Sequence, residues 1–302
     1  RPSGVDTSEY FGFALAMAKR EVGSSSLTPF LIGDYSASAV HVYEYDSSSL
    51  TASHLRSYLS TATNGGSSAS LGYAVAISAN GRVMCTAGDQ VDQLYCSHSG
   101  FASAFRIRTS SDAGRVLSLS LSANGLLLAV AYTNKADVVR LDSAVSDPSS
   151  SSLPSFAFHT LYKYATPAQV PSLSSSGNTQ WGAGIDVSDD GGVIAIALSG
   201  ENKLLIFEPA NASSPTSNVS EQLVYDKVVD VNVLIDGCGY TGVHKNITGR
   251  VVLSRQGTKV LLARPQCNEK EGKIGLFAPM GGKKWRDAQN VTQLAGVEYI
   301  DS

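Results

Sequence analysis

The chain has 302 residues, of which 43% are apolar and 16% are charged, and its formal net charge is -3. The balance of 23 basic against 26 acidic residues excludes the strongly basic class of nucleic-acid-binding proteins. No uninterrupted apolar run approaches the roughly 18 residues that a membrane-spanning helix needs. Serine is in excess, with 44 residues, 38 of them before residue 201, and its runs lie between apolar segments, where polar loops are expected.

One sequence motif recurs along the chain: a strand in which large and small residues alternate, a Ser-x-Asn/Asp-Gly turn, and a second apolar strand. After a degenerate copy over residues 11–34, it returns over residues 71–88, 116–132, 181–198 and 249–263. The alternation sets large side chains against Gly, Ala and Ser, so both faces of these strands are expected to be covered. An Asn/Asp-Gly pair supplies the left-handed residue that a tight hairpin requires.

Further strands follow each copy of this motif. Third strands are predicted at residues 39–45, 101–107, 137–141, 203–207 and 273–277. Fourth strands are predicted at residues 55–59, 156–164, 222–229 and 291–300, with none between residues 108 and 116. Period-2 alternation over such short segments is typical of strands.

Repetition of a three- or four-stranded unit five times predicts an all-β fold, a β-propeller of five antiparallel blades. The expected blades cover residues 9–66, 67–114, 115–178, 179–245 and 246–302 of one domain, 1–302. Two alternatives stay open: six or seven blades, with an extra one within 142–178 or 212–246, and a two-sheet sandwich.

Two motif sets carry a resemblance to known families. Phe11-Gly12, Leu71-Gly72 and Trp181-Gly182 at strand starts, with Gly33-Asp34 and Gly88-Asp89 closing the next strand, resemble the FG-GAP repeats of integrin-α-like heads. The Ser-x-Asn/Asp-Gly turn resembles YVTN and WD40-like repeats. Both resemblances imply a propeller, and FG-GAP members are commonly extracellular binding heads.

The sequence differs from the integrin-type pattern at the calcium-binding loop, because the acidic D-x-D-x-D-G motif is absent. Its nearest match places Asp186, Ser188 and Asp190 around a hairpin turn. Calcium binding by these three residues is one interpretation. A plain hairpin turn with one aspartate inside the strand is the favoured one, so no metal and no cofactor are expected.

Asparagine sequons and cysteines indicate the secretory pathway. Asn-x-Ser/Thr occurs four times, all in the last third of the chain, at Asn211, Asn218, Asn246 and Asn290. The four cysteines allow three pairings, and the pairing local in sequence joins Cys85 to Cys96 and Cys238 to Cys267; four buried thiols are the alternative. The start at Arg1-Pro2 is expected of a processed ectodomain without its signal peptide, with any membrane anchor outside this chain.

No catalytic motif stands out from the sequence. The five histidines are scattered, and His41, between Val40 and Val42, is interpreted as a solvent- or channel-facing strand residue rather than a base. Analogy with five-bladed glycosidases would draw on carboxylates, of which four are candidates: Asp6, Asp34, Asp89 and Asp186.

The favoured function is therefore non-catalytic, that of an extracellular or cell-surface glycoprotein in adhesion, as a receptor or as a surface antigen. Its expected partner is a protein or glycan bound by the propeller face or loops. A glycosidase and an intracellular propeller scaffold are the alternatives.

Overall fold

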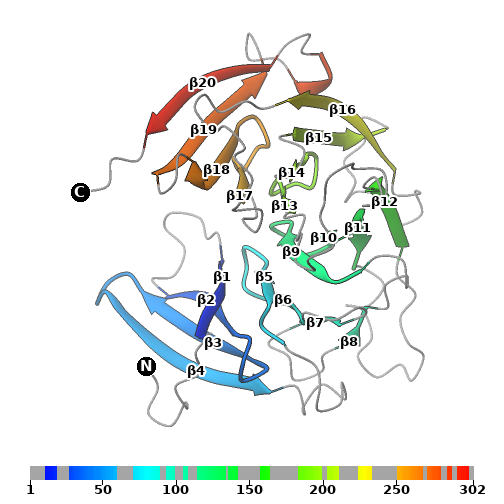
Figure 1. Ribbon diagram of the computed structural model, residues 1–302. Coiled ribbons are helices and arrows are strands. Elements are labelled where there is room, and N and C mark those ends of the chain that lie inside the picture. The colour runs from blue at the N-terminus through cyan, green and yellow to red at the C-terminus, as the bar shows by residue number, and fades with distance from the viewer. Residues whose placement is uncertain are drawn as a thin grey trace, which may run out of the picture. The chain divides into compact units, whose positions relative to one another are not determined.

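The structure is a computed structural model in which five β-sheets account for nearly all the regular structure (Figure 1). It describes residues 11–18, 27–59, 71–88, 93–98, 105–107, 114–133, 135–141, 157–163, 183–198, 203–210, 224–232, 250–267, 271–279, 284–287 and 291–298. Within these ranges there is no α-helix, and none of the helical structure is long and apolar enough to cross a membrane.

Each sheet has four antiparallel strands that follow one another in sequence. Sheet 1 contains β1 (Phe11–Met17), β2 (Leu27–Asp34), β3 (Ala39–Asp46) and β4 (Thr51–Leu59). Sheet 2 contains β5 (Ala74–Ile77), β6 (Val83–Ala87), β7 (Leu94–His98) and β8 (Phe105–Arg106). Sheet 3 contains β9 (Val116–Leu121), β10 (Leu127–Tyr132), β11 (Lys135–Arg140) and β12 (Ala157–Lys163). Sheet 4 contains β13 (Ala183–Val187), β14 (Ile194–Leu198), β15 (Lys203–Pro209) and β16 (Tyr225–Asn232). Sheet 5 contains β17 (Arg250–Leu253), β18 (Val260–Cys267), β19 (Glu271–Pro279) and β20 (Val291–Glu298), with a 3₁₀ turn, η5 (Trp285–Asp287), before β20.

The repeat of five sheets was predicted, but the strand assignment in sheet 2 was wrong. Residues 101–107 were expected to form its third strand, whereas the third strand is β7, and the two residues of β8 form the fourth. β7 mixes aromatic, polar and apolar residues without clean alternation, so its pattern gave no strand signal. Its pairing with β6 instead places Cys96 opposite Cys85.

The Ser-x-Asn/Asp-Gly turns share one hydrogen-bond pattern. In sheet 2 the Ser78 hydroxyl donates to Asn80 Oδ1 at 2.7 Å and accepts the Val83 N–H at 3.0 Å. The same pair of bonds is made by Ser122 and by Ser188 in the turns of sheets 3 and 4. A short side chain that bonds the local backbone stabilises a turn, so the serine and the Asn/Asp of the motif have structural roles.

Neighbouring turns are also bonded to one another. The Ala79 N–H of sheet 2 donates to the Ala123 carbonyl of sheet 3 at 3.1 Å. The Asp189 N–H of sheet 4 donates to the Arg255 carbonyl of sheet 5 at 2.9 Å. In each case the donor and the acceptor directly follow the turn serine, so in these two pairs of sheets the repeated turn also makes the contact between the sheets.

The core lies between sheets, as the alternation of large and small residues predicts. All residues of β10 and of β14 are buried, and so are those of β11. Leu128 and Val130 of β10 join one apolar cluster with residues of sheet 2, while Ala195 and Ala197 of β14 join another with residues of sheet 5. Burial on both strand faces follows because the small residues let a neighbouring sheet approach closely.

The chain divides into two compact units. The first comprises residues 1–132 and 139–157, and the second comprises residues 133–138 and 158–302. Sheets 1 and 2 belong to the first unit, and sheets 4 and 5 belong to the second.

Candidate binding surface

Three glycines with left-handed backbone lie at the starts of the first strands of sheets 1 to 3. Gly12, Gly72 and Gly114 have φ angles of 86°, 87° and 77°. The residues that follow them are Phe13, Tyr73 and Arg115, so a large side chain occupies the same place in each copy. Glycine is suited to this position because a left-handed backbone is unfavourable for other residues.

These large side chains meet in one cluster within the first unit. The ring centroids of Phe13 and Tyr73 are 5.0 Å apart, and the guanidinium carbon of Arg115 is 5.7 Å from the Tyr73 ring centroid. Tyr35, from the turn between β2 and β3, adds a third ring at 5.5 Å from Phe13 and 5.7 Å from Tyr73. We call these four residues, Phe13, Tyr35, Tyr73 and Arg115, the aromatic cluster.

The aromatic cluster is accessible to solvent. Phe13 is 42% exposed, and Tyr35, Tyr73 and Arg115 are half-buried. Aromatic rings with an adjacent arginine combine apolar area with directional polar groups, the combination found at the centres of protein interfaces.

Hydrogen bonds to β6 of sheet 2, and close packing of Gly72 against sheet 1, hold Tyr73 in place. The Gly72 N–H donates to Thr86 Oγ1 at 3.2 Å, and the Tyr73 N–H donates to the Ala87 carbonyl at 3.0 Å. A methyl group on Gly72 would lie 2.5 Å from the Ala39 carbonyl oxygen and 3.0 Å from the Gly33 Cα. The x-Gly motif therefore permits the close approach of two sheets and sets the start of the strand that carries Tyr73.

Tyr35 is positioned by the neighbouring Asp34. Asp34 is fully buried, and its Oδ1 accepts the Ala37 N–H at 3.1 Å, which closes the turn that contains Tyr35. Its other carboxylate oxygen lies 3.7 Å from His41 Nε2, beyond hydrogen-bond distance. This carboxylate, one of the glycosidase candidates, thus takes part in a turn beside the aromatic cluster.

His41 is buried, so the interpretation of a solvent-facing position is wrong. Its side chain is 3% exposed. Its Nδ1 lies 2.7 Å from Ser57 Oγ, which is also 2.9 Å from His54 Nε2. Burial lowers the pKa of His41 below 6.5; the negative charge of Asp34 opposes this shift, and His54 adds to it. A neutral His41 therefore joins β3 to β4 through Ser57.

Asp186 and Asp190 have structural partners of their own. Asp186, 8% exposed, accepts the Leu253 N–H of sheet 5 at 2.8 Å. Asp190 accepts the Ser188 hydroxyl at 2.7 Å and the Gly192 N–H at 2.9 Å. Across the described part of the chain, no three His, Cys, Asp or Glu side chains gather as metal ligands would. The contacts of Asp186 and Asp190 are those of an aspartate inside a strand and of a hairpin turn, respectively.

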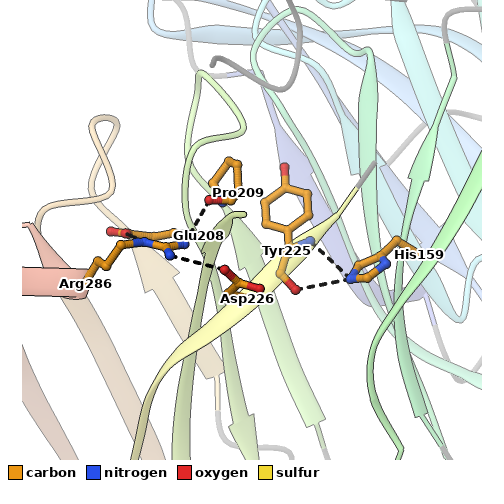
Figure 2. A network of polar contacts seen from close by, with 6 residues as sticks. All are labelled: His159, Glu208, Pro209, Tyr225, Asp226 and Arg286. Atoms are coloured by element: carbon orange, nitrogen blue, oxygen red, sulfur yellow. Dashed lines mark hydrogen bonds and ion pairs between the residues drawn. The ribbon is translucent and has the colours of Figure 1, made fainter. Parts of the chain in front are cut away.

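Sheets 4 and 5 are joined at their outer strands by Arg286 of η5, as Figure 2 shows. Its guanidinium donates to Asp226 Oδ2 at 3.1 Å and to the Pro209 carbonyl at 2.9 Å, and it lies 3.5 Å from Glu208 Oε2. Because Arg286 and Asp226 are nearly half exposed, each ion pair contributes at most about 1 kcal/mol. This network fixes the end of β15 and the start of β16 to η5.

His159 makes a second contact in the same view. Its Nε2 lies 3.1 Å from the Tyr225 backbone nitrogen and 3.2 Å from the Tyr225 carbonyl oxygen, so the imidazole meets the start of β16 (Figure 2). The Tyr225 hydroxyl in turn donates to the Gly191 carbonyl at 2.6 Å. These contacts bond side chains to backbone and have a structural role.

One of the cysteine predictions is confirmed. Cys85 and Cys96 form a disulfide across β6 and β7, and both are fully buried. Several other predicted residues, or their side chains, lie outside the described residues: Asp6, Asp89, Asn211, Asn218, Cys238, Asn246, Cys267 and Asn290. Glycosylation of the four asparagines and a Cys238–Cys267 bond therefore stay predictions.

Sequence reasoning missed the aromatic cluster as a site. The copies Gly12-Phe13 and Gly72-Tyr73 were visible within the FG-GAP-like motif, but Gly114-Arg115 was not grouped with them because it lacks the preceding aromatic or leucine residue. The signal that could have found the cluster is a large side chain directly after a glycine near the start of the first strand in each of sheets 1 to 3.

Comparison with known proteins supports the fold. No protein-family model matches the sequence, and no curated protein matches it. Among solved structures, the β-propeller domain of Cps50 (Swd1) from Myceliophteria thermophila is similar with a TM-score of 0.53 and 11% identity, over 95% of this chain and 72% of that one. A chain of a mitotic checkpoint complex gives a TM-score of 0.51 and 12% identity over 92% of this chain and 63% of that one. KlAtg21, solved with the coiled coil of AgAtg16, gives a TM-score of 0.51 and 10% identity over 94% and 70%.

These similarities and the five antiparallel sheets confirm the predicted fold class, an all-β propeller. The propeller part of the family resemblance is thereby confirmed, whereas the FG-GAP assignment stays a prediction.

Proposed function

We propose that this chain is a non-catalytic binding head that engages a partner protein through the aromatic cluster. The observation that carries the proposal is the convergence of Phe13, Tyr73 and Arg115 from three successive sheets, with Tyr35 beside them. A large side chain at the same place in each of three copies forms one continuous surface. Tyr and Arg are enriched among the residues that dominate binding energy in protein interfaces.

Two of the similar structures support a protein partner. KlAtg21 was solved in complex with the coiled coil of AgAtg16, and another similar chain belongs to a mitotic checkpoint complex. Propellers of this kind thus occur within protein assemblies. The intracellular scaffold is the second candidate function, and these same two complexes are the observations that favour it.

We further propose that the chain is an extracellular or cell-surface glycoprotein of the secretory pathway. The four sequons in the last third of the sequence support this, and so does the buried Cys85–Cys96 disulfide. Disulfides persist in oxidising compartments and are rare in the cytosol, which favours the secretory assignment over the intracellular scaffold.

The binding proposal is tested with the fluorescently labelled 302-residue chain and cells of its source. We expect saturable binding that disappears after the cell surface is treated with protease, and that is lost in Phe13→Ala. Phe158→Ala is the matched control, because Phe158 is also 42% exposed but lies on β12. Equal binding by the two variants would refute a role of the aromatic cluster in this binding, and absence of saturable binding would refute a protein partner at the cell surface.

The compartment is tested separately by mass spectrometry of the natively produced protein. We expect glycan on Asn211, Asn218, Asn246 or Asn290 and no free thiol at Cys85 and Cys96. Four bare asparagines together with reduced cysteines would contradict the secretory proposal and leave the scaffold.

A further inference from the structure

We propose that the aromatic cluster recognises a segment of its partner protein in which an Asp or Glu side chain stands beside an apolar side chain. The carboxylate pairs with Arg115, and the apolar side chain packs against Phe13 and Tyr73. This inference rests on the proposed binding function and specifies the chemistry of the ligand.

The first support is the state of Arg115. Its guanidinium lies over the Tyr73 ring, and among the residues that the structure describes it has no ion-pair partner. By contrast, Arg286 is paired with Glu208 and Asp226, and Arg255 is paired with Asp189 at 2.8 Å. Arg115 therefore keeps N–H donors that a ligand carboxylate can use.

Stacking on Tyr73 prepares Arg115 for such a ligand. A guanidinium held against an aromatic face has fewer rotamers to lose on binding, and its planar fork matches the two oxygens of a carboxylate. Because Arg115 is half-buried, an ion pair there is screened less than one on the open surface. Charge-assisted hydrogen bonds of this kind are about twice as strong as neutral ones.

The second support is the shape of the apolar part. The ring of Phe13 is tilted by 34° to Tyr35 and by 37° to Tyr73, while Tyr35 and Tyr73 meet edge to face at 71°. Mutually tilted rings present edges and faces together, which suits a side chain of similar size. A sugar ring would instead be expected to lie flat on one open aromatic face.

The charge distribution disfavours nucleic acid as the occupant. Arg115 is the only charged member of the aromatic cluster, and the chain as a whole carries a net charge of -3. Binding to a phosphate backbone depends on several basic side chains acting together. A single arginine beside three rings fits one carboxylate and one apolar neighbour.

The test begins with selection of a displayed random-peptide library on the 302-residue chain. We expect enriched peptides to pair Asp or Glu with a neighbouring apolar residue. Synthetic copies of the best peptide, with the acid or with its amide, are then titrated against the protein by calorimetry. Replacing the carboxylate by the amide should weaken binding about 10- to 100-fold, and binding of the acidic peptide should weaken as salt rises.

Protein variants locate the contact. Arg115→Gln should weaken the acidic peptide about 10- to 100-fold and leave the amide peptide nearly unchanged. Arg56→Gln is the matched control, because Arg56 also lies 5.7 Å from a tyrosine ring, that of Tyr58 on β4. The comparison of acid with amide on the unaltered protein keeps the test valid even if Arg115→Gln misfolds.

Several outcomes would overturn the inference. Enrichment of peptides without acids, equal affinity for acid and amide, or equal effects of Arg115→Gln and Arg56→Gln would each refute it. Saturable binding on a glycan array that Arg115→Gln abolishes, without any acidic peptide selected, would assign the surface to glycans instead. If cell binding is still lost in Phe13→Ala, the proposed binding function stands although its carboxylate chemistry fails.

Discussion

The close approach of sheets 1 and 2 predicts that two glycines with the same backbone conformation differ sharply in their tolerance of a methyl group. Gly12 and Gly72 have φ angles of 86° and 87°. Among the described residues, a methyl group on Gly12 would have no neighbour within 4 Å, whereas one on Gly72 would lie 2.5 Å from the Ala39 carbonyl oxygen and 2.8 Å from the Asp34 nitrogen. Comparing Gly12→Ala with Gly72→Ala therefore separates the free-energy cost of a left-handed backbone from the cost of steric overlap.

The expected magnitudes follow from these two contributions. A left-handed alanine costs about 1–2 kcal/mol in the folded state, part of which is offset because alanine has less freedom than glycine when unfolded. Gly12→Ala should thus lower the free energy of unfolding by about 1 kcal/mol. In Gly72→Ala the methyl group meets backbone atoms that cannot rotate away, which adds about 1–3 kcal/mol, for a total of about 2–4 kcal/mol.

The assay is urea denaturation followed by far-ultraviolet circular dichroism, with the free energies obtained by linear extrapolation. Gly33→Ala provides a second arm, because Gly33 faces Gly72 across the same gap. Once either methyl has pushed the sheets apart, the second should cost less, so the double variant should lose less stability than the sum of the singles. Equal losses for Gly12→Ala and Gly72→Ala, with strict additivity for Gly33 and Gly72, would show that the sheets do not approach as described.

Three further predictions concern other contacts. Replacing both Cys85 and Cys96 by alanine removes the disulfide between residues that are 11 positions apart and should lower the free energy of unfolding by about 3 kcal/mol. Reductant should destabilise the unaltered protein by breaking this bond, and it should not destabilise the double variant in this way. Asp186→Ala should cost about 1–3 kcal/mol because the Leu253 N–H loses its acceptor, whereas Asp186→Asn keeps an acceptor oxygen and should cost less; equal losses would contradict the bond. Burial lowers the pKa of His41 in the folded state below 6.5. As the pH falls through 6.5, His41 therefore binds a proton in the unfolded chain before it does so in the folded chain. The free energy of unfolding should fall with pH from 6.5 down to the pKa of His41 in the folded state. His41→Asn should flatten this part of the pH profile measured by denaturation between about pH 7 and about pH 5, and an unchanged profile would refute the assignment.

Local rules account for the parts of the fold that the sequence predicted. Turn chemistry at Ser78 and its copies, and the alternation of large with small residues in strands such as β10 and β14, depend on neighbours within a few positions. The turn recurs in sheets 2, 3 and 4, which strengthened the signal. β7 was missed since it lacks alternation, and its place is set by pairing with β6 and by the bond from Cys96 to Cys85.

The contacts that form the candidate site could not be predicted from local sequence patterns. Phe13, Tyr73 and Arg115 are separated by 60 and 42 positions (73 − 13 and 115 − 73), and their contact follows from how far apart successive sheets lie. The burial of His41 has a similar origin. Its neighbours Val40 and Val42 predicted the strand correctly, but Ser57, whose hydroxyl lies within hydrogen-bond distance of His41, comes from β4.

The same repeat separates the residues that stabilise the fold from those available for recognition. Turn serines at positions 78, 122 and 188 are identical because each makes the same bonds to the backbone, and substitution there removes a bond from the scaffold. At the place after the left-handed glycine the backbone is set by the glycine, so the side chain that follows is free to differ, and it does: phenylalanine, tyrosine and arginine. Variation at this place changes the chemistry of the surface while the sheets stay in register. A binding surface in such a fold is therefore expected where the repeat is regular in backbone and irregular in side chain, which is where the aromatic cluster lies.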